Sequence, residues 1–120
     1  MAWDKTGAVR HLQTNARQSS QSRCAEYTRR AIEAGGLRLM HTASAKNYGS
    51  SLICAGFREV RGTPQPGDVV VIQAITGHPH GHMAMFDGQI WISDFRQMHG
   101  FYPAQVYRTI KPAYQICRHD

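Results

Sequence analysis

The chain has 120 residues, enough for one compact domain over residues 1–120 but not for two independent hydrophobic cores. Hydrophobic residues make up 42% of it and charged residues 18%, a globular composition that excludes a disordered polypeptide. The formal net charge is +6 at pH 7, from 14 Lys and Arg against 8 Asp and Glu, which indicates an anionic partner. No apolar stretch approaches the roughly 18 residues of a membrane-spanning helix, so we expect no membrane insertion.

The N-terminal segment contains neither an apolar core region nor a small-residue cleavage site. We therefore expect no secretory signal peptide. A protein of this kind is made in the cytoplasm, and it either stays there or leaves by a route that does not read such a signal.

Helices are predicted in the first half of the chain, which is poor in β-branched runs, over residues 8–17, 24–34 and about 44–55. The second of these begins at Cys24, directly after a polar segment with several potential N-caps. It ends before Gly35 and Gly36, a natural C-terminal stop. Its polar face offers two ion pairs spaced four residues apart, Glu26 with Arg30 and Arg29 with Glu33.

Strands are predicted in the second half, over residues 57–60, 68–74, 82–86, 89–93 and 113–118. Asp87 and Gly88 form a favoured two-residue turn between the third and fourth of these. Helices followed by strands are typical of an α+β fold, with the helices packed on an antiparallel sheet.

Cys24 is the first candidate for chemistry. The positive end of the helix dipole and the unpaired N–H groups of a first helical turn favour a thiolate, and Arg23 adds positive potential. The same N–H groups can stabilise an oxyanion during acyl transfer. The alternative is a small packing residue that happens to begin a helix, which is the role of most free cysteines.

His82 is the second candidate, because it begins a strand directly after Gly81 and a strand holds a general base rigidly. A lone histidine at such a position is more often structural.

The order of these features resembles a known family. Residues 22–25, 67–71 and 81–85 are similar to the corresponding pieces of the CHAP and NlpC-like cysteine peptidases, papain-like hydrolases that cut peptidoglycan peptides. Residues 89–97 and 101–103 resemble the type VI secretion amidase effectors more closely still. The resemblance covers about residues 19–103. It implies a papain-like α+β fold in which an N-terminal helix carrying the cysteine packs on an antiparallel sheet carrying the histidine.

The resemblance also implies roles for single residues. Cys24 is the nucleophile, His82 is the general base, and a third polar residue on the next strand orients the imidazole. Asp94 lies 12 positions after His82, which matches the usual spacing in the family. A two-residue turn at 87–88 places Ser93 opposite His82, whereas a three-residue loop or a bulge places Asp94 there, so both remain open.

The function implied by the resemblance is that of a peptidoglycan amidase or endopeptidase that hydrolyses amide bonds of the stem peptide or its cross-link. Some family members cut between D-glutamate and diaminopimelate, and others cut the cross-link between diaminopimelate and D-alanine, which we favour here. The enzyme would need no cofactor. It would be an antibacterial toxin that the type VI secretion machinery delivers into the periplasm of a target cell, and a cognate immunity protein would neutralise it.

Two other functions stay open at this stage. A phage or housekeeping cell-wall hydrolase, or another cysteine peptidase or transferase, would use the same residues. A basic module that binds nucleic acid or another anionic polymer would explain the charge, but no zinc finger, helix-turn-helix or aromatic–basic signature is present, so we expect no nucleic-acid partner.

The remaining histidines and cysteines offer two further alternatives. His78, His80 and His82 have a spacing that suggests a metal, but Pro79 and Gly81 disfavour a regular strand there, so we expect no metal site. Cys54 and Cys117 form either a disulfide in an oxidising compartment or two reduced packing residues.

Overall fold

The computed structural model describes residues 2–120. Its elements in chain order are α1 (Lys5–Asn15), α2 (Cys24–Ala34), the 3-10 helix η1 (Ala45–Asn47), α3 (Tyr48–Cys54), β1 (Arg58–Val60), β2 (Val69–Ile72), β3 (His82–Phe86), β4 (Trp91–Ile92), β5 (Arg96–Gln97), α4 (Gln105–Ile110) and β6 (Tyr114–Arg118). The strands form one antiparallel sheet in the order β1-β6-β2-β3-β4-β5, which confirms the predicted α+β class. Within residues 2–120, no helix has the length and apolarity that crossing a bilayer requires.

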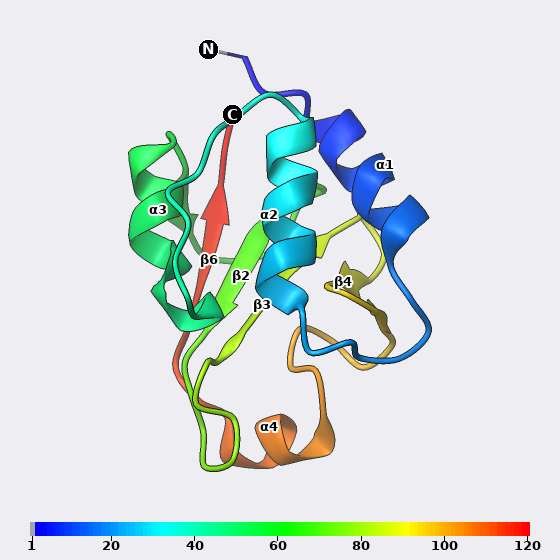
Figure 1. Cartoon of the computed structure of the whole chain (residues 1–120), viewed down its shortest axis with the longest axis vertical. Coiled ribbons are helices and arrows are strands. Elements are labelled where there is room, and N and C mark those ends of the chain that lie inside the picture. The colour runs from blue at the N-terminus through cyan, green and yellow to red at the C-terminus, as the bar shows by residue number, and fades with distance from the viewer. Residues whose placement is uncertain (1) are drawn as a thin grey trace.

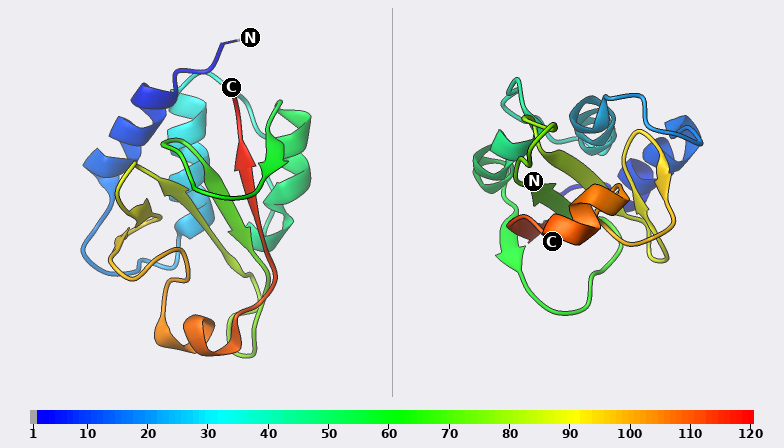
Figure 2. Two further views of the ribbon diagram at one scale, coloured as in Figure 1. Left: turned by 180° about the vertical axis from the view of Figure 1, so that it is seen from behind. Right: turned by 90° about the horizontal axis from the view of Figure 1, so that it is seen from below.

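The helices and the sheet form two layers. Figure 1 shows α1, α2 and α3 on one face of the sheet, with α2 crossing in front of β2 and β3. On the opposite face, α4 and the residues before it cover one end of the sheet (Figure 2). The N-terminal end of α2 therefore lies at the same end of the molecule as α4 (Figure 1).

The central strand β2 is buried on both faces. Val69 and Val71 belong to the main core beneath the helices, whereas Val70 and Ile72 belong to a second cluster on the α4 side that includes Tyr107. A strand that is covered on both sides has no polar alternation, which is why its sequence is a continuous run of apolar residues.

Several predicted elements are confirmed closely. The helix over Cys24–Ala34 and the strand over His82–Phe86 have the predicted bounds. Both predicted ion pairs of α2 form, with N–O distances of 3.2 Å for Arg30–Glu26 and 2.9 Å for Arg29–Glu33. The first helix begins earlier than predicted because the Asp4 carboxylate caps it, accepting a hydrogen bond of 2.9 Å from the N–H of Gly7.

The predicted hairpin after β3 is wrong in its turn and in the length of its second strand. Phe86 pairs with Trp91, so the connection is a four-residue loop over 87–90 rather than a two-residue turn. The Asp87 carboxylate accepts hydrogen bonds of 2.8 Å from the N–H groups of Gln89 and Ile90, which stabilises the longer loop. The chain then turns back after Ile92 to form β5, an element that the sequence did not predict.

Candidate active site

His82 is held at the beginning of β3 by its pairing with the neighbouring strand and by the backbone conformation of the residue before it. It pairs with Ile72 of β2, and its residue is 6% exposed. The preceding residue, Gly81, has a φ of +70°, and a Cβ at this position would collide with the carbonyl oxygen of Ile72. The glycine that drew attention in the sequence is therefore needed for the close approach that directs the chain into β3.

Cys24 lies beside the N-terminal half of β3, where the sheet is incomplete. In the described residues, β4 pairs with β3 at Met85 and Phe86 and not nearer to His82. Thr28, one turn after Cys24, donates a hydrogen bond of 3.4 Å to the carbonyl oxygen of Met83, and the backbone N–H of Met83 interacts with the Cys24 thiol.

A hollow of about 380 Å³ contains the three predicted site residues, and we call it the catalytic hollow. Its lining includes Cys24 from α2, His82 from β3 and Asp94 from the turn between β4 and β5. Residues that are 58 and 70 positions apart from Cys24 in the sequence are thus brought to one cavity.

The hydrogen-bond partner of the His82 ring is Gln97 of β5, at 2.6 Å between Nε2 and Oε1. The Gln97 amide nitrogen donates to the carbonyl oxygens of Gly100 at 3.1 Å and Phe101 at 2.8 Å, so its oxygen must face the ring. The ring therefore donates from Nε2–H, and Nδ1 is left as the basic nitrogen. The expectation that Asp94 or Ser93 makes this hydrogen bond is wrong, because the four-residue loop and the turn back into β5 place Gln97 there instead.

Asp94 is fully buried and holds the segment that precedes Cys24. Its Oδ2 accepts hydrogen bonds from the backbone N–H groups of Gln21 at 2.6 Å and Arg23 at 3.0 Å. The intervening Ser22 has a φ of +59°, a conformation that residues other than glycine seldom adopt. The two hydrogen bonds hold this turn in place at the entrance to α2, and Oδ1 accepts a third, of 3.1 Å, from the Ser93 hydroxyl.

The Cys24 thiol is less acidic than the sequence suggested. Burial and, to a smaller extent, the negative charge of Asp94 raise its pKa to about 11, although hydrogen bonds from backbone N–H groups, chiefly that of Met83, oppose the increase. The expectation that the helix terminus gives Cys24 a lowered pKa is therefore wrong, because removing the sulfur from water outweighs the effect of the helix.

The His82 imidazole is also neutral at pH 7. Burial lowers its pKa to about 4, and the contact with Gln97 and the charge of Asp94 reduce the size of this decrease. The two shifts together favour a neutral thiol and a neutral imidazole in the catalytic hollow over a thiolate–imidazolium pair.

The lowered pKa of His82 predicts a specific pH dependence of stability. Between about pH 6.5 and 4 the unfolded chain binds a proton that the folded chain does not, so the free energy of unfolding falls as the pH falls through this window. We expect the contribution of His82 to this loss to be about 3 kcal/mol. Urea unfolding of the wild type and of His82→Gln at pH 7 and pH 4 measures it. A variant of exposed His99, His99→Gln, should keep the wild-type dependence, and an unchanged dependence in His82→Gln would contradict the prediction.

Tyr107 of α4 is a further residue of the site that the sequence did not single out. It lines the catalytic hollow, its ring centroid lies 6.2 Å from that of His82, and its hydroxyl donates a hydrogen bond of 3.3 Å to the carbonyl oxygen of Gly81. Burial raises the pKa of its hydroxyl, so the group stays protonated at neutral pH. No local signal in the sequence marks α4 as a wall of this cavity.

The other histidines and cysteines lie outside this cluster or at its border. His78 and His80 belong to the loop before β3, and His80 is held by a contact of 2.6 Å between its Nδ1 and the Ser44 hydroxyl. In residues 2–120, no group of three His, Cys, Asp or Glu side chains is arranged to hold a metal ion. Cys54 and Cys117 are free thiols, the first exposed and the second buried.

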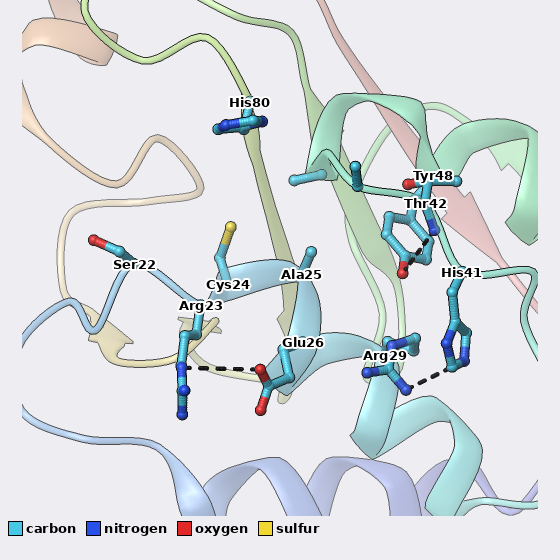
Figure 3. Close-up of a pocket in the computed structure, with 12 residues that line it drawn as sticks. Ser22, Arg23, Cys24, Ala25, Glu26, Arg29, His41, Thr42, Tyr48 and His80 are labelled. Atoms are coloured by element: carbon cyan, nitrogen blue, oxygen red, sulfur yellow. Dashed lines mark hydrogen bonds and ion pairs between the residues drawn. The ribbon is translucent and has the colours of Figure 1, made fainter.

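A second hollow, of about 510 Å³, opens on the other side of Cys24, and we call it the charged hollow because Arg23, Glu26, Arg29 and His41 are among its lining residues. Figure 3 shows the Cys24 sulfur pointing away from α2 toward the side of this hollow on which His80 lies. Three residues, Ser22, Cys24 and His80, line both hollows. The two hollows therefore adjoin at Cys24, and we call the two together the groove.

Helices that pack on an antiparallel sheet, with a cysteine at a helix N-terminus and a histidine on the adjacent strand, define the papain-like class of α+β proteins. No family model and no curated protein matches the chain. Two solved structures of the type VI effector–immunity complex Tae3–Tai3 from Ralstonia pickettii do. One has 53% identity and a TM-score of 0.96 and covers 98% of this chain and 100% of the other. The second has 56% identity and a TM-score of 0.90, with coverage of 92% and 98%.

The structure of Ly7917 is a more distant neighbour, with 19% identity and a TM-score of 0.59 over 93% of this chain and 61% of the other, and it supports the fold alone. The chain belongs to the Tae3 family of type VI secretion amidase effectors. The family resemblance noted in the sequence is thereby confirmed.

Proposed function

We propose that this protein is a cysteine amidase that hydrolyses amide bonds of the peptidoglycan stem peptide or its cross-link, and that it acts as an antibacterial type VI secretion effector. The observation that carries the proposal is the catalytic hollow that Cys24 and His82 both line, with the His82 imidazole hydrogen-bonded to Gln97, in a chain 53% identical to Tae3. We expect the cross-link between diaminopimelate and D-alanine to be the bond that is cut.

In the proposed reaction, the His82 Nδ1 accepts the thiol proton as the Cys24 sulfur attacks the amide carbonyl. The N–H groups of the first turn of α2 stabilise the oxyanion that forms. The imidazolium then protonates the leaving amine, and water, deprotonated by His82, hydrolyses the thioester. Asp94 supports the imidazolium by its charge, since it raises the pKa of His82 without a hydrogen bond to the ring.

Delivery to the target cell and inhibition by an immunity protein are part of the proposed function. We propose that residues 1–120 form a single catalytic domain, made in the cytoplasm and delivered by the type VI secretion machinery into the periplasm of a target cell. The related Tae3 forms a complex with the immunity protein Tai3. By the same logic a cognate immunity protein would cover the groove of this chain. The net charge of +6 would help it to associate with an anionic cell wall.

The experiment that tests this function is digestion of purified peptidoglycan, with the products separated and identified by mass. Cleavage of the cross-link converts dimeric muropeptides to monomers. Cleavage within the stem instead shortens the peptides of dimeric and monomeric muropeptides alike. Soluble fragments of either kind support the proposal. Intact peptidoglycan, together with salt-sensitive retention on DNA, would favour the basic binding module instead.

Gln97→Leu is expected to lower kcat about a hundredfold and to leave KM nearly unchanged, because Gln97 positions His82 and fixes its tautomer without touching the substrate. Gln89→Leu is the matched control, since Gln89 is exposed on the loop after β3. Steady-state kinetics on a soluble cross-linked muropeptide measures both constants. A Gln97→Leu enzyme that has wild-type kcat, or that is changed in KM alone, would show that Gln97 does not orient the base.

A further inference from the structure

The groove on both sides of Cys24 implies that the substrate extends in two directions from the bond that is cut. An amide carbonyl that reaches the sulfur places its acyl part on one side and its amine part on the other. Side chains line the hollow on each side of Cys24, so the acyl part and the amine part of the substrate each have a surface to contact.

The two sides differ in chemistry. The catalytic hollow is bordered by apolar and aromatic side chains, among them Phe95, Pro103 and Tyr107. The charged hollow has two arginines, Arg23 and Arg29, against one carboxylate, Glu26. That carboxylate already pairs with two cations, Arg30 at 3.2 Å and Arg23 at 3.9 Å, so the balance of the charged hollow is positive.

Arg29 is less exposed than Arg23 and His41, the other side chains of the charged hollow that can carry a positive charge. Its side chain is 18% exposed, and its Nη1 donates to the Glu33 carboxylate at 2.9 Å and lies 3.3 Å from His41 Nε2 (Figure 3). In the described part of the chain, these contacts occupy one of its three nitrogens. The Nε and Nη2 donors remain available to a ligand, and a guanidinium presents them in a geometry that matches a carboxylate.

Glu33 fixes Arg29 and His41 relative to each other. Its Oε1 accepts from Arg29, and its Oε2 lies 3.1 Å from His41 Nε2. Although burial opposes it, the hydrogen bonds from His41, the Leu39 N–H and Arg29 hold the pKa of Glu33 below its ordinary value, so it is a carboxylate at neutral pH. Two side chains that carry hydrogen-bond donors are thus preorganised at the wall of the charged hollow, and one of them, Arg29, is five residues after Cys24 on the same helix.

We propose that Arg29, supported by His41, forms a subsite that binds a free carboxylate of the substrate. This inference rests on the proposed function, since the D-glutamate and diaminopimelate residues of a stem peptide each carry such a carboxylate beside an amide bond. It adds to that function a preference for the free acid, so that amidation of the recognised carboxylate makes the peptide a poorer ligand and a poorer substrate.

The test uses three cross-linked muropeptides: the free acid, the form amidated at diaminopimelate and the form amidated at D-glutamate. Calorimetry with the Cys24→Ala protein measures their affinities without turnover, and kinetics with the wild-type cysteine measures kcat/KM. We expect one amidated form to bind about tenfold more weakly than the free acid. Arg29→Gln should abolish this difference. Arg10→Gln is the matched control, because Arg10 is exposed on α1 and lines neither the charged hollow nor the catalytic hollow.

The two readouts separate the inference from the proposed function. Equal affinity for all three peptides, or a preference that persists in Arg29→Gln, would overturn the inference even if hydrolysis proceeds. Preferential binding without hydrolysis by the wild type would support the subsite and refute the amidase. Should Arg29→Gln not fold, Arg29→Lys and His41→Gln take its place, and each is expected to reduce the preference.

Discussion

Replacing Cys24 by alanine is expected to lower peptidoglycan hydrolysis by at least about a thousandfold, because it removes the sulfur that attacks the amide in the proposed mechanism. The fold should survive, since Cys24 is only partly buried and the change removes one atom at the mouth of a cavity. His82→Ala should cause a loss of similar size, because a thiol with a pKa of about 11 is almost entirely protonated at neutral pH without a base to remove its proton. Release of soluble muropeptides over time measures both effects.

The control for Cys24→Ala is Cys54→Ala, which removes an exposed thiol at the end of α3 and should leave hydrolysis unchanged. Circular dichroism and thermal unfolding establish that each variant is folded. Activity near the wild-type level in a folded Cys24→Ala protein would exclude covalent catalysis by this residue, and with it the mechanism proposed above.

The parts of the fold that the sequence predicted well are those with signals at both ends. The bounds of α2 follow from a polar segment before Cys24 and from the glycines after Ala34. The beginning of β3 follows from Gly81, whose backbone conformation the fold requires. Because these two elements carry the proposed nucleophile and the proposed base, the sequence predicted the local position of both residues without knowledge of the tertiary structure.

The residue that orients the base could not be predicted in the same way. Its identity depends on the length of the loop over 87–90 and on the reversal after Ile92, and a change of one residue in either alters every cross-strand neighbour. Asp87 and Gly88 are typical of a two-residue turn, but the Asp87 side chain stabilises the longer loop instead. Gln97 then reaches His82 from a strand of two residues, too short to leave a pattern in the sequence.

The acidity of Cys24 was missed for a related reason. The helix terminus is visible in the sequence, whereas the burial of the sulfur depends on tertiary neighbours, among them residues of the 94–107 region that line the catalytic hollow. Local sequence signals predicted which residues take part, and tertiary contacts determine their protonation states.

Asp94 provides the second prediction with a large effect. Asp94→Ala is expected to lower the free energy of unfolding by about 3 kcal/mol, because it leaves the N–H groups of Gln21 and Arg23 without an acceptor beside the unusual conformation of Ser22. The entrance to α2 should then lose its order, and with it the position of the Cys24 sulfur, so hydrolysis should fall about a hundredfold or more. Urea unfolding and the muropeptide assay measure the two losses.

Asp94→Asn separates the two roles of this side chain. An asparagine can present its carbonyl oxygen to the same two N–H groups and donate to the Ser93 hydroxyl from its nitrogen, so stability should stay within about 1 kcal/mol of the wild type. What it removes is the charge that raises the pKa of His82. We therefore expect intermediate activity, lower than the wild type because the imidazolium loses support and higher than Asp94→Ala because the entrance to α2 keeps its shape. If Asp94→Ala unfolds like the wild type, Asp94 does not anchor this turn. If a stable Asp94→Asn protein is as inactive as Asp94→Ala, the charge beside His82 is what catalysis requires of this residue.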